Sequence, residues 1–250
     1  MLAAGVGIRY SSGWAIRSAS FRLDHDCLAL DDAIRHETTR GASLGIAASR
    51  PASSSALIDL LAGRAAPDYG SLHVLGRDMS TPKGRSHVRR QVGIARGSGM
   101  PQAFFRVRGL VEHAARLACE PGDDRHLLAA AILDRLGLTG WADVPVRSAP
   151  DLIVRKARLA AAAVHQPSLL LIDGLLDNLP AADLAILAEV IHTLERDATV
   201  VAIGRSPEVL MQACHKVLVL ADGILIDCRA PSQPASQPEL LCAHGPAYRD

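Results

Sequence analysis

Residues 48–55, with the sequence ASRPASSS, stand between an apolar stretch and the helix-forming run ALIDLLAG, where a phosphate-binding loop would stand. Such a loop follows G-x-x-x-x-G-K-[ST]: the glycines let backbone amides surround phosphates, the lysine neutralises them, and the hydroxyl binds Mg²⁺. Here Ala48 and Ser53 replace the glycines, Ser54 replaces the lysine, and Ser55 keeps the hydroxyl that would meet a metal ion. The loop residues expected to contact a bound nucleotide are Ala48, Arg50, Ser53, Ser54 and Ser55.

The absence of the lysine weakens the case for a nucleotide. A lysine–phosphate contact is a charge-assisted hydrogen bond worth about 1.5–3 kcal/mol, so its loss lowers affinity about tenfold or more. The N-terminus of the following helix still attracts an anion. The alternative is a serine-rich turn between a strand and a helix with no ligand, and the loop taken alone favours that alternative.

Composition limits the classes of protein to consider. The 250 residues suffice for one globular domain with a sizeable core. With 27 Lys and Arg against 26 Asp and Glu, the formal net charge of +1 gives no reason to expect nucleic acid as a partner. The five cysteines form no C-x-x-C pair, which is typical of reduced cytoplasmic thiols. No apolar run approaches the ~20 residues that cross a bilayer, so any membrane association is expected to depend on another chain.

Hydrophobic patterns predict two kinds of sheet. Residues 14–23 and 71–79 alternate apolar and polar, which predicts half-buried strands of an antiparallel layer near the N-terminus. Residues 41–47 are predicted to form the strand that enters the serine-rich loop. Continuous apolar runs at 168–173 and 198–204 are typical of strands buried on both faces of a parallel sheet. The chain is therefore predicted to be an α/β protein.

The other segments complete this organisation. Residues 179–197 predict an amphipathic helix between two parallel strands, and 216–227 predict a closing hairpin turned by Asp222-Gly223. A region of helix formers at about 100–150 predicts a helical lobe inserted into the α/β core. Residues 229–250 are rich in Pro, Ser and Gln, and we expect them to form a separate C-terminal tail.

Five segments match one family in order and spacing: GVGIRYSSGWAIRSASFRL, LLAGRAAPDYGSLHVLGRDM, RRQVGIARG, KARLAAAAVHQPSLLLIDG and DATVVAIGRSPEVLMQACHKVLVLADGILID. Together they resemble the nucleotide-binding subunit of an ABC transporter over nearly all of residues 5–228. The resemblance implies an α/β P-loop NTPase (RecA-like) core with an N-terminal antiparallel β layer and an inserted helical lobe, over residues 1–228. It also implies that Tyr10 stacks on adenine, although an added segment at 24–39 separates Tyr10 from the loop.

The same resemblance implies that the hydrolytic residues are missing. Asp173 matches the Walker B aspartate and is the second expected metal contact, but Gly174 follows it where the family has the glutamate that polarises water. Gly97 stands at the glutamine that senses magnesium, with Gln102 close by. Arg205 matches the switch histidine, and an arginine binds phosphate but does not shuttle a proton.

Two dimer-forming motifs also differ from the family pattern. Residues 149–153, with the sequence APDLI, align with the LSGGQ signature that caps the nucleotide of the partner subunit. Pro150 has no N–H to offer, and Asp151 brings negative charge toward a phosphate. Pro180 stands at the position of the D-loop aspartate, with Asp177 nearby but out of register.

These differences predict a pseudo-ATPase. General acid–base assistance supplies about 10²–10⁴-fold, so its loss leaves hydrolysis near background. The resemblance implies weak binding of ATP and Mg²⁺ if any. The implied partners are an integral membrane permease at the inner face of the cell membrane and a second ABC ATPase subunit, in a homodimer or heterodimer. The alternatives are an active ATP-hydrolysing subunit with atypical motifs and a nucleotide-free scaffolding module.

Other conspicuous residues carry weaker signals. Three histidines are predicted to lie on helices as surface or partly buried side chains rather than ligands, namely His113, His165 and His215. The basic segment 83–91 has no interleaved aromatics, which favours a solvated face. Phe104 and Phe105 lie where the family groove receives a permease helix, so a phenylalanine facing outward would be a docking contact.

Overall fold

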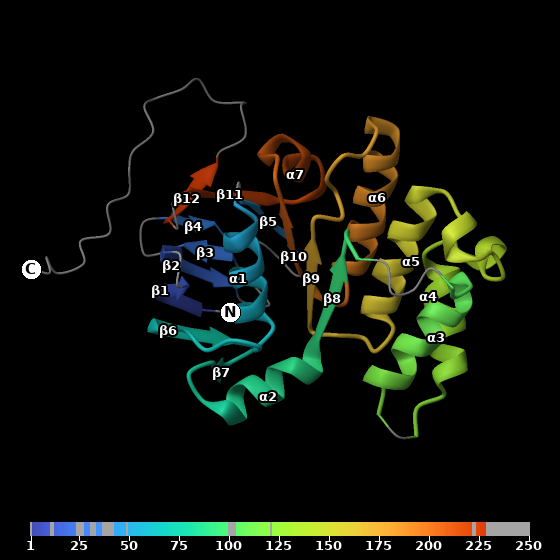
Figure 1. The fold of residues 1–250 in the computed structure, drawn as a ribbon, viewed down its shortest axis with the longest axis horizontal. Helices are drawn as coiled ribbons and strands as arrows, with labels where there is room; N and C mark the ends of the chain where they lie inside the picture. The colour runs from blue at the N-terminus through green and yellow to red at the C-terminus, as the bar shows by residue number, and fades with distance from the viewer. Residues whose placement is uncertain are drawn as a thin grey trace, which may run out of the picture.

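Figure 1 shows the chain in a computed structural model that describes residues 2–10, 13–23, 28–30, 34–36, 43–48, 50–99, 104–120, 122–221 and 224–228. The described strands form one 12-stranded sheet with the order β7-β6-β1-β2-β12-β11-β5-β10-β9-β8, and β3 and β4 lie off this path. The strands are β1 (Leu2–Tyr10), β2 (Gly13–Leu23), β3 (Leu28–Leu30), β4 (Ile34–His36), β5 (Ser43–Ala48), β6 (Tyr69–Val74), β7 (Arg77–Asp78), β8 (Val92–Arg96), β9 (Leu169–Asp173), β10 (Thr199–Gly204), β11 (Lys216–Ala221) and β12 (Ile224–Cys228).

The N-terminal layer is antiparallel, as predicted. Strand β1 pairs antiparallel with both β2 and β6, and β6 pairs antiparallel with β7. The added segment at 24–39 contains β3 and β4, which pair with each other, and β3 also pairs antiparallel with β2. This segment therefore extends the antiparallel layer.

The core of the sheet is parallel. Strands β11, β5, β10, β9 and β8 pair parallel in that order, so their carboxyl ends lie at one edge of the sheet. Every residue of β5 is buried, as expected for a strand covered on both faces. The predicted closing hairpin is confirmed, because β12 pairs antiparallel with β11, but its turn at Asp222-Gly223 lies outside the described residues.

Helices cover the parallel strands on both faces, which gives the three layers visible in Figure 1. Alternate strand residues point to opposite layers: Leu169 and Leu171 pack with α1, whereas Leu170 and Ile172 pack with α5 and α6. The helices are α1 (Pro51–Leu61), α2 (Pro82–Gln91), α3 (Val107–Ala118), α4 (Arg125–Arg135), α5 (Asp151–Ala163), α6 (Ala181–Leu194) and α7 (Pro207–Ala213), with 3-10 turns η1 (Thr139–Trp141) and η2 (Val146–Ser148).

The start of α1 corrects a sequence-based expectation. The loop was expected to continue through Ser55, but the helix begins at Pro51. Proline is favoured at the first helical position because its fixed φ suits a helix and its missing N–H has no intrahelical partner there. The serines expected to surround a phosphate therefore lie in the first turn of a helix.

The helical lobe lies to one side of the sheet, where α3 and α4 pack against α5 (Figure 1). Its boundaries at about 100–150 and the division at residue 228 stay predictions. Phe105 packs on the core beside His113, with ring centroids 5.2 Å apart, whereas Phe104 is 89% exposed. One of the two adjacent phenylalanines therefore faces outward.

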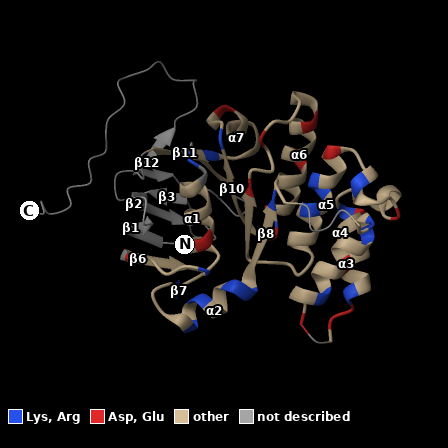
Figure 2. Ribbon diagram, in the orientation of Figure 1, with Lys and Arg blue, Asp and Glu red and all other residues tan. Residues whose placement is uncertain are grey.

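Surface features follow the sequence patterns in part. Figure 2 shows Lys and Arg along α2, whose Arg89 and Arg90 are exposed, as a solvated basic face requires. His113 lies on α3 as expected. The expectation of a helix is wrong for His165, which follows the end of α5, and for His215, because the extended backbone of Cys214 ends α7. None of the described helices has the length and apolar character required to span a membrane.

Candidate functional site

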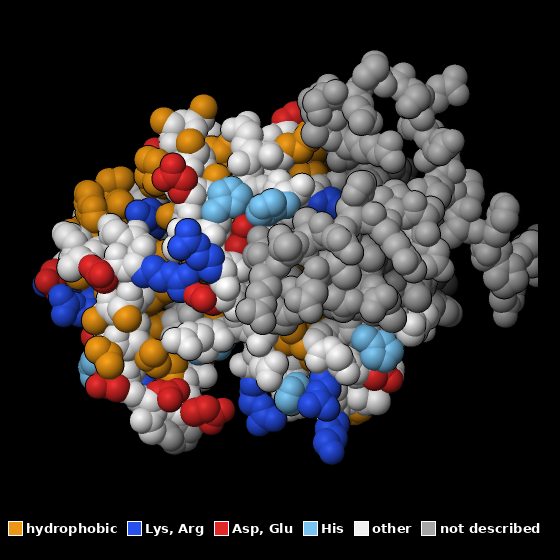
Figure 3. All heavy atoms as spheres, turned by 180° about the vertical axis from the view of Figure 1, so that it is seen from behind, with side chains coloured by type: hydrophobic (Ala, Val, Ile, Leu, Met, Phe, Trp, Pro, Cys, Tyr) orange, Lys and Arg blue, Asp and Glu red, His pale blue; other side chains and the backbone are white. Residues whose placement is uncertain are grey.

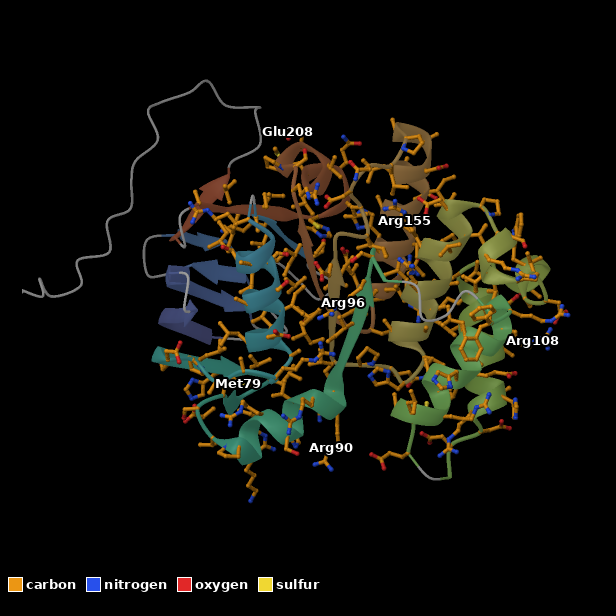
Figure 4. The ribbon with its side chains drawn as sticks, viewed as in Figure 1. Met79, Arg90, Arg96, Arg108, Arg155 and Glu208 are labelled. Carbon is orange, nitrogen blue, oxygen red and sulfur yellow. The ribbon has the colours of Figure 1, made fainter. Side chains whose placement is uncertain are left out.

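The candidate site lies at the carboxyl edge of the parallel strands, where ligands bind in open α/β sheets. Strand β5 leads here into α1, β8 ends at Arg96, β9 ends at Asp173, and β10 ends at Gly204. Figure 4 labels Arg96 near the centre of the molecule, between α1 and α5. The sheet topology thus brings together segments that are far apart in the sequence.

The first turn of α1 uses amides that a phosphate loop would direct at its ligand. The Ser53 and Ser54 N–H groups donate to the Arg50 carbonyl oxygen at 3.0 and 3.2 Å, and Pro51 has no N–H. Arg50 precedes the helix with an extended backbone and provides no side-chain cap. Ser53 is buried, and Ala48 is buried at the end of β5. The backbone here is a helix start rather than a loop that curls around an anion.

Asp173 is the central acid of the site. Burial raises the pKa of Asp173 above its ordinary value, while the charge of Arg96 and a hydrogen bond from the Ser54 side chain act to lower it. Arg96 Nε lies 3.8 Å from Asp173 Oδ2. The structure therefore brings Ser54 to the acid, whereas Ser55, the predicted metal contact, is exposed. The metal-binding roles of Ser55 and Asp173 stay predictions.

Gly97 and Gly174 are in close backbone contact. The Gly97 N–H donates to the Asp173 carbonyl oxygen at 2.7 Å, and the Gly174 N–H donates to the Ile203 carbonyl oxygen at 2.8 Å. A Cβ on Gly97 would lie only 2.4 Å from the Gly174 carbonyl oxygen. Gly174 also has φ +62°, a conformation that residues with a side chain rarely adopt. This backbone arrangement leaves no room for a side chain at Gly97 and disfavours a side chain at Gly174.

Arg205 is held by Asp177. Its backbone N–H donates to Asp177 Oδ1 at 3.0 Å, and its Nε lies 4.0 Å from Asp177 Oδ2. The Arg205 side chain is 75% exposed, whereas that of Asp177 is 16% exposed. Sequence reasoning noted Asp177 only as out of register with the D-loop. Asp177 lies in the loop that follows β9 and Asp173, and this position was the signal that could have identified it.

The segment matched to the signature motif is tied to its own chain. Asp151 opens α5 and accepts a hydrogen bond from Arg155 Nε at 2.7 Å. The same arginine, which Figure 4 labels near the start of α5, donates to the carbonyl oxygens of Leu175 and Asp177. The start of α5 is therefore fastened to the loop after β9 by one guanidinium group.

A second arginine of α5 fastens the loop after β8. Arg158 donates from its guanidinium group to three backbone carbonyl oxygens of that loop, those of Arg96, Gly97 and Gly99. Both loops that border Asp173 are thus hydrogen-bonded to arginines of α5.

The described residues do not match the donor set of a P-loop magnesium–phosphate site. The only ion pair of Asp173 among the described residues is with Arg96, so a guanidinium group stands where a metal complex would supply the positive charge. The Ser53 and Ser54 amides, which would face a phosphate, serve the helix instead. The side chain of Tyr10, at the end of β1, and the residue Gln102 lie outside the described part of the structure.

Comparisons with known proteins identify similar sequences. The chain is 30% identical over 202 residues to the methionine import ATP-binding protein MetN of Nocardia farcinica, covering 75% of this chain and 58% of the relative. It is 28% identical over 217 residues to the macrolide export ATP-binding/permease protein MacB of Sodalis glossinidius, covering 84% of this chain and 33% of the relative. The chain thus spans about a third to somewhat over half of the length of these relatives. No family model matches the chain.

Comparisons with solved structures concern the fold. The structure of cbiO1 from Clostridium perfringens, described as part of the ABC transporter complex cbiONQ, matches with a TM-score of 0.71 and 19% identity, over 90% of this chain and 86% of the other. A nucleotide-free ATP-binding cassette from an ABC transporter matches with a TM-score of 0.69 and 14% identity, over 90% and 88% of the two chains. The chain is a homologue of the ATP-binding subunits of ABC transporters and has the P-loop fold of their ATPase domains.

Proposed function

We propose that this chain is a degenerate ABC transporter subunit that docks on a membrane permease and supports or regulates transport with little or no ATP hydrolysis of its own. Its homology to ATP-binding subunits supports the transport context. The observation that carries the absence of hydrolysis is the environment of Asp173, which has Arg96 as its counter-charge and Gly174 as its successor.

The chemistry of hydrolysis needs a base beside the attacking water. The pKa of Asp173 is raised by burial, but its carboxylate faces Arg96 and Ser54. Gly174 has no side chain, and an arginine such as Arg205 donates hydrogen bonds but does not shuttle a proton. Hydrolysis needs a group that accepts a proton from the attacking water. None of Asp173, Gly174 and Arg205 is suited to that role, so we expect the rate of ATP hydrolysis to equal that of the uncatalysed reaction.

ATP and Mg²⁺ are expected to bind weakly. A helix N-terminus and the exposed guanidinium of Arg205 remain as sources of positive charge. The residues proposed to contact a nucleotide are Tyr10, Ala48, Arg50, Ser53, Ser54, Ser55, Asp173 and Arg205. Without a lysine, these contacts rely on hydroxyls, on stacking and on the arginines Arg50 and Arg205.

Docking on a permease is supported by one solved relative and by one exposed side chain. The cbiO1 protein is described as part of a transporter complex. Phe104, at the start of the helical lobe, is 89% exposed. A large apolar side chain turned to solvent suits a contact with a partner helix. This partner would place the chain at the inner face of the cell membrane, together with a second ABC subunit in a homodimer or heterodimer.

Phosphate release by the purified full-length chain with ATP and Mg²⁺ tests the absence of hydrolysis. The expected rate equals the buffer background, and Asp173→Asn does not change it. Asp183→Asn, which removes an acid from the first turn of α6, is the matched control. A turnover of order 1 s⁻¹ that disappears in Asp173→Asn and persists in Asp183→Asn contradicts the proposal and identifies an active ATPase with atypical motifs.

Binding of a fluorescent ATP analogue, with and without Mg²⁺, separates a weak nucleotide-binding subunit from a nucleotide-free scaffold. Saturable binding that weakens in Arg205→Ala supports a nucleotide-binding subunit, whereas no saturable binding supports a nucleotide-free scaffold.

Native mass spectrometry in nucleotide-free buffer tests assembly. Because both the loop and the signature segment are altered, we expect any dimer or permease complex to form without ATP. Assembly that requires ATP and Mg²⁺ would favour an authentic ATPase.

A further inference from the structure

A cluster of two histidines and a glutamate lies at the amino edge of the parallel strands, opposite the candidate nucleotide site. His192 belongs to the last turn of α6, Glu195 is the residue that ends this helix, and His215 lies between α7 and β11. Ser43, the first residue of β5, lies beside them. We call His192, Glu195 and His215 the His–Glu cluster.

The potential ligand atoms of the cluster converge. Nδ1 of His192 lies 3.1 Å from Glu195 Oε2, and Nδ1 of His215 lies 3.5 Å from the same oxygen. One ligand atom from each residue can be chosen so that all three lie within 4.8 Å of one another. Ligands about 2.0–2.2 Å from a tetrahedral zinc ion are about 3.4 Å apart, so the two measured edges already have the required length.

Glu195 is buried without full satisfaction. Its side chain is 3% exposed, and its Oε1 has no hydrogen-bond partner. Buried carboxylates are normally paired or coordinate a metal, because removing the charge from water costs several kcal/mol. Both histidine side chains are 45% exposed, so an ion can reach the cluster from solvent. Figure 3 shows two histidine side chains side by side on the molecular surface with an acidic side chain beside them.

Ser43 and Glu195 surround the Nδ1 atom of His215. The Ser43 backbone nitrogen lies 3.4 Å and the Ser43 hydroxyl oxygen 3.1 Å from this atom. The same Nδ1 lies 3.5 Å from Glu195 Oε2. A cation between the imidazole nitrogens and the carboxylate would be attracted to the negative charge of Glu195. Neutral imidazole and carboxylate are the states in which these groups coordinate a metal.

We propose that the His–Glu cluster binds one divalent transition-metal ion, Zn²⁺, through His192, Glu195 and His215, with water as the fourth ligand. Two imidazoles and one carboxylate form a known three-residue ligand set for zinc, and imidazole ligands do not suit Mg²⁺ or Ca²⁺. The ion joins the end of α6 to the segment that enters β11, next to the first residue of β5. It therefore links the amino ends of the parallel strands.

Cys214 is not part of the ligand set. Burial, followed by the negative charge of Glu195, raises the pKa of the Cys214 thiol to about 12. The Cys214 thiol is also not among the ligand atoms that converge at the cluster. This separates the proposed site from a cysteine-based zinc site and predicts that Cys214→Ala keeps zinc binding.

Calorimetric titration of the untagged, chelator-treated full-length chain with ZnCl₂, in nucleotide-free buffer, tests the proposal. The expected result is one ion per chain. His192→Asn and His215→Asn are each expected to weaken binding at least about tenfold, since each removes one of three ligands. His126→Asn is the matched control, because His126 is an exposed histidine paired with Glu112 at 3.3 Å without a second histidine. It should bind zinc as the wild type does.

Two further measurements separate coordination from non-specific binding. Co²⁺ in place of Zn²⁺ should give visible d–d absorption of a low-coordinate site in the wild type and in His126→Asn, and lose it in His215→Asn. Thermal denaturation without metal should give the same unfolding midpoint for His215→Asn and His126→Asn as for the wild type. Equal midpoints would show that both variants fold. No binding up to roughly 100 µM Zn²⁺, or equal binding by all variants, overturns the proposal.

Discussion

The two edges of the parallel sheet balance buried acids in different ways. At the carboxyl edge, Asp173 faces Arg96 and Asp177 faces Arg205. At the amino edge, Glu195 is more deeply buried, yet it has two imidazoles as neighbours and one oxygen without a partner. The fold thus supplies its own cations at the edge where the family binds a metal complex, and it leaves an acid without a permanent cation at the opposite edge.

This difference contrasts two ways in which one fold accommodates a buried acid. A guanidinium group beside an aspartate provides charge balance without a metal ion. The carboxyl edge therefore has its counter-charges within the chain, although burial outweighs Arg96 at Asp173. The amino edge has no permanent counter-charge, because imidazoles are charged only when protonated. We expect mutations to reveal this contrast as changes in the free energy of unfolding.

The largest effect is expected from Gly97→Ala at the carboxyl edge. The new Cβ would lie 2.4 Å from the Gly174 carbonyl oxygen, a backbone atom that cannot rotate away. We expect a loss of about 3 kcal/mol in the free energy of unfolding, measured by urea denaturation. Gly140→Ala is the control, because a Cβ there meets nothing within 4 Å, and it should change stability by no more than about 0.5 kcal/mol. Equal losses of unfolding free energy in Gly97→Ala and Gly140→Ala would show that the loops after β8 and β9 are loosely packed.

A smaller effect is expected when one acid is removed from each edge. Asp177→Ala removes the acceptor of the Arg205 N–H and should cost about 1 kcal/mol. Its exposed ion pair adds little. Glu195→Gln in zinc-free buffer removes a buried charge without a permanent cation, so it should be neutral or stabilising. Chemical denaturation of both variants measures the contrast. If Glu195→Gln costs more than Asp177→Ala in zinc-free buffer, the amino edge is already balanced and the comparison fails.

The smallest effect concerns pH. Burial raises the folded-state pKa of Asp173 above its ordinary value of 3.8, so the associated stability is present in full below pH 3.8 and is lost as pH rises through the folded pKa. Asp173→Asn should therefore be more stable than the wild type at neutral pH, with a difference that shrinks as pH falls. Unfolding free energies measured across this pH range test the sign.

Asp78→Asn provides the control of opposite sign. A hydrogen bond from the Ser80 backbone lowers the pKa of Asp78, so its stabilising contribution is present above its ordinary value of 3.8 and is lost as pH falls through the folded pKa. This variant should be less stable than the wild type at neutral pH. Differences of the same sign for Asp173→Asn and Asp78→Asn would show that burial does not govern Asp173.

Local sequence patterns predicted most of the described fold. Alternation indicated β2, continuous apolar runs indicated β9 and β10, and helical periodicity indicated α6. The single strand predicted at 71–79 is divided into β6 and β7, which pair antiparallel. These patterns depend on which side of an element is buried, which is written in neighbouring residues. The start of α1 was missed because Pro51 is compatible with both a loop and a first helical turn, and only the hydrogen bonds decide between them.

The partners within the site were harder to predict. Arg96 and Asp173 are register partners on adjacent parallel strands, so their contact depends on the order of β8 and β9 in the sheet. The cluster of His192 and His215 depends in the same way on how α6, β10 and α7 return the chain to one edge. A search of the sequence for closely spaced residues finds neither the Arg96–Asp173 pair nor the His192–His215 pair. In both pairs the two residues are far apart in the sequence.

The contact between Gly97 and Gly174 also bears on the history of the chain. Suppose that an ancestor carried glutamine and glutamate at these two positions. Once both loops had closed to a separation that admits no Cβ, a single reversion at Gly97 would meet the opposing backbone before any catalytic benefit arose. A reversion at Gly174 would begin with an unfavourable backbone conformation. Return to the ancestral chemistry would therefore require two coordinated substitutions and a loop movement, and selection acting on one substitution at a time would retain the present form.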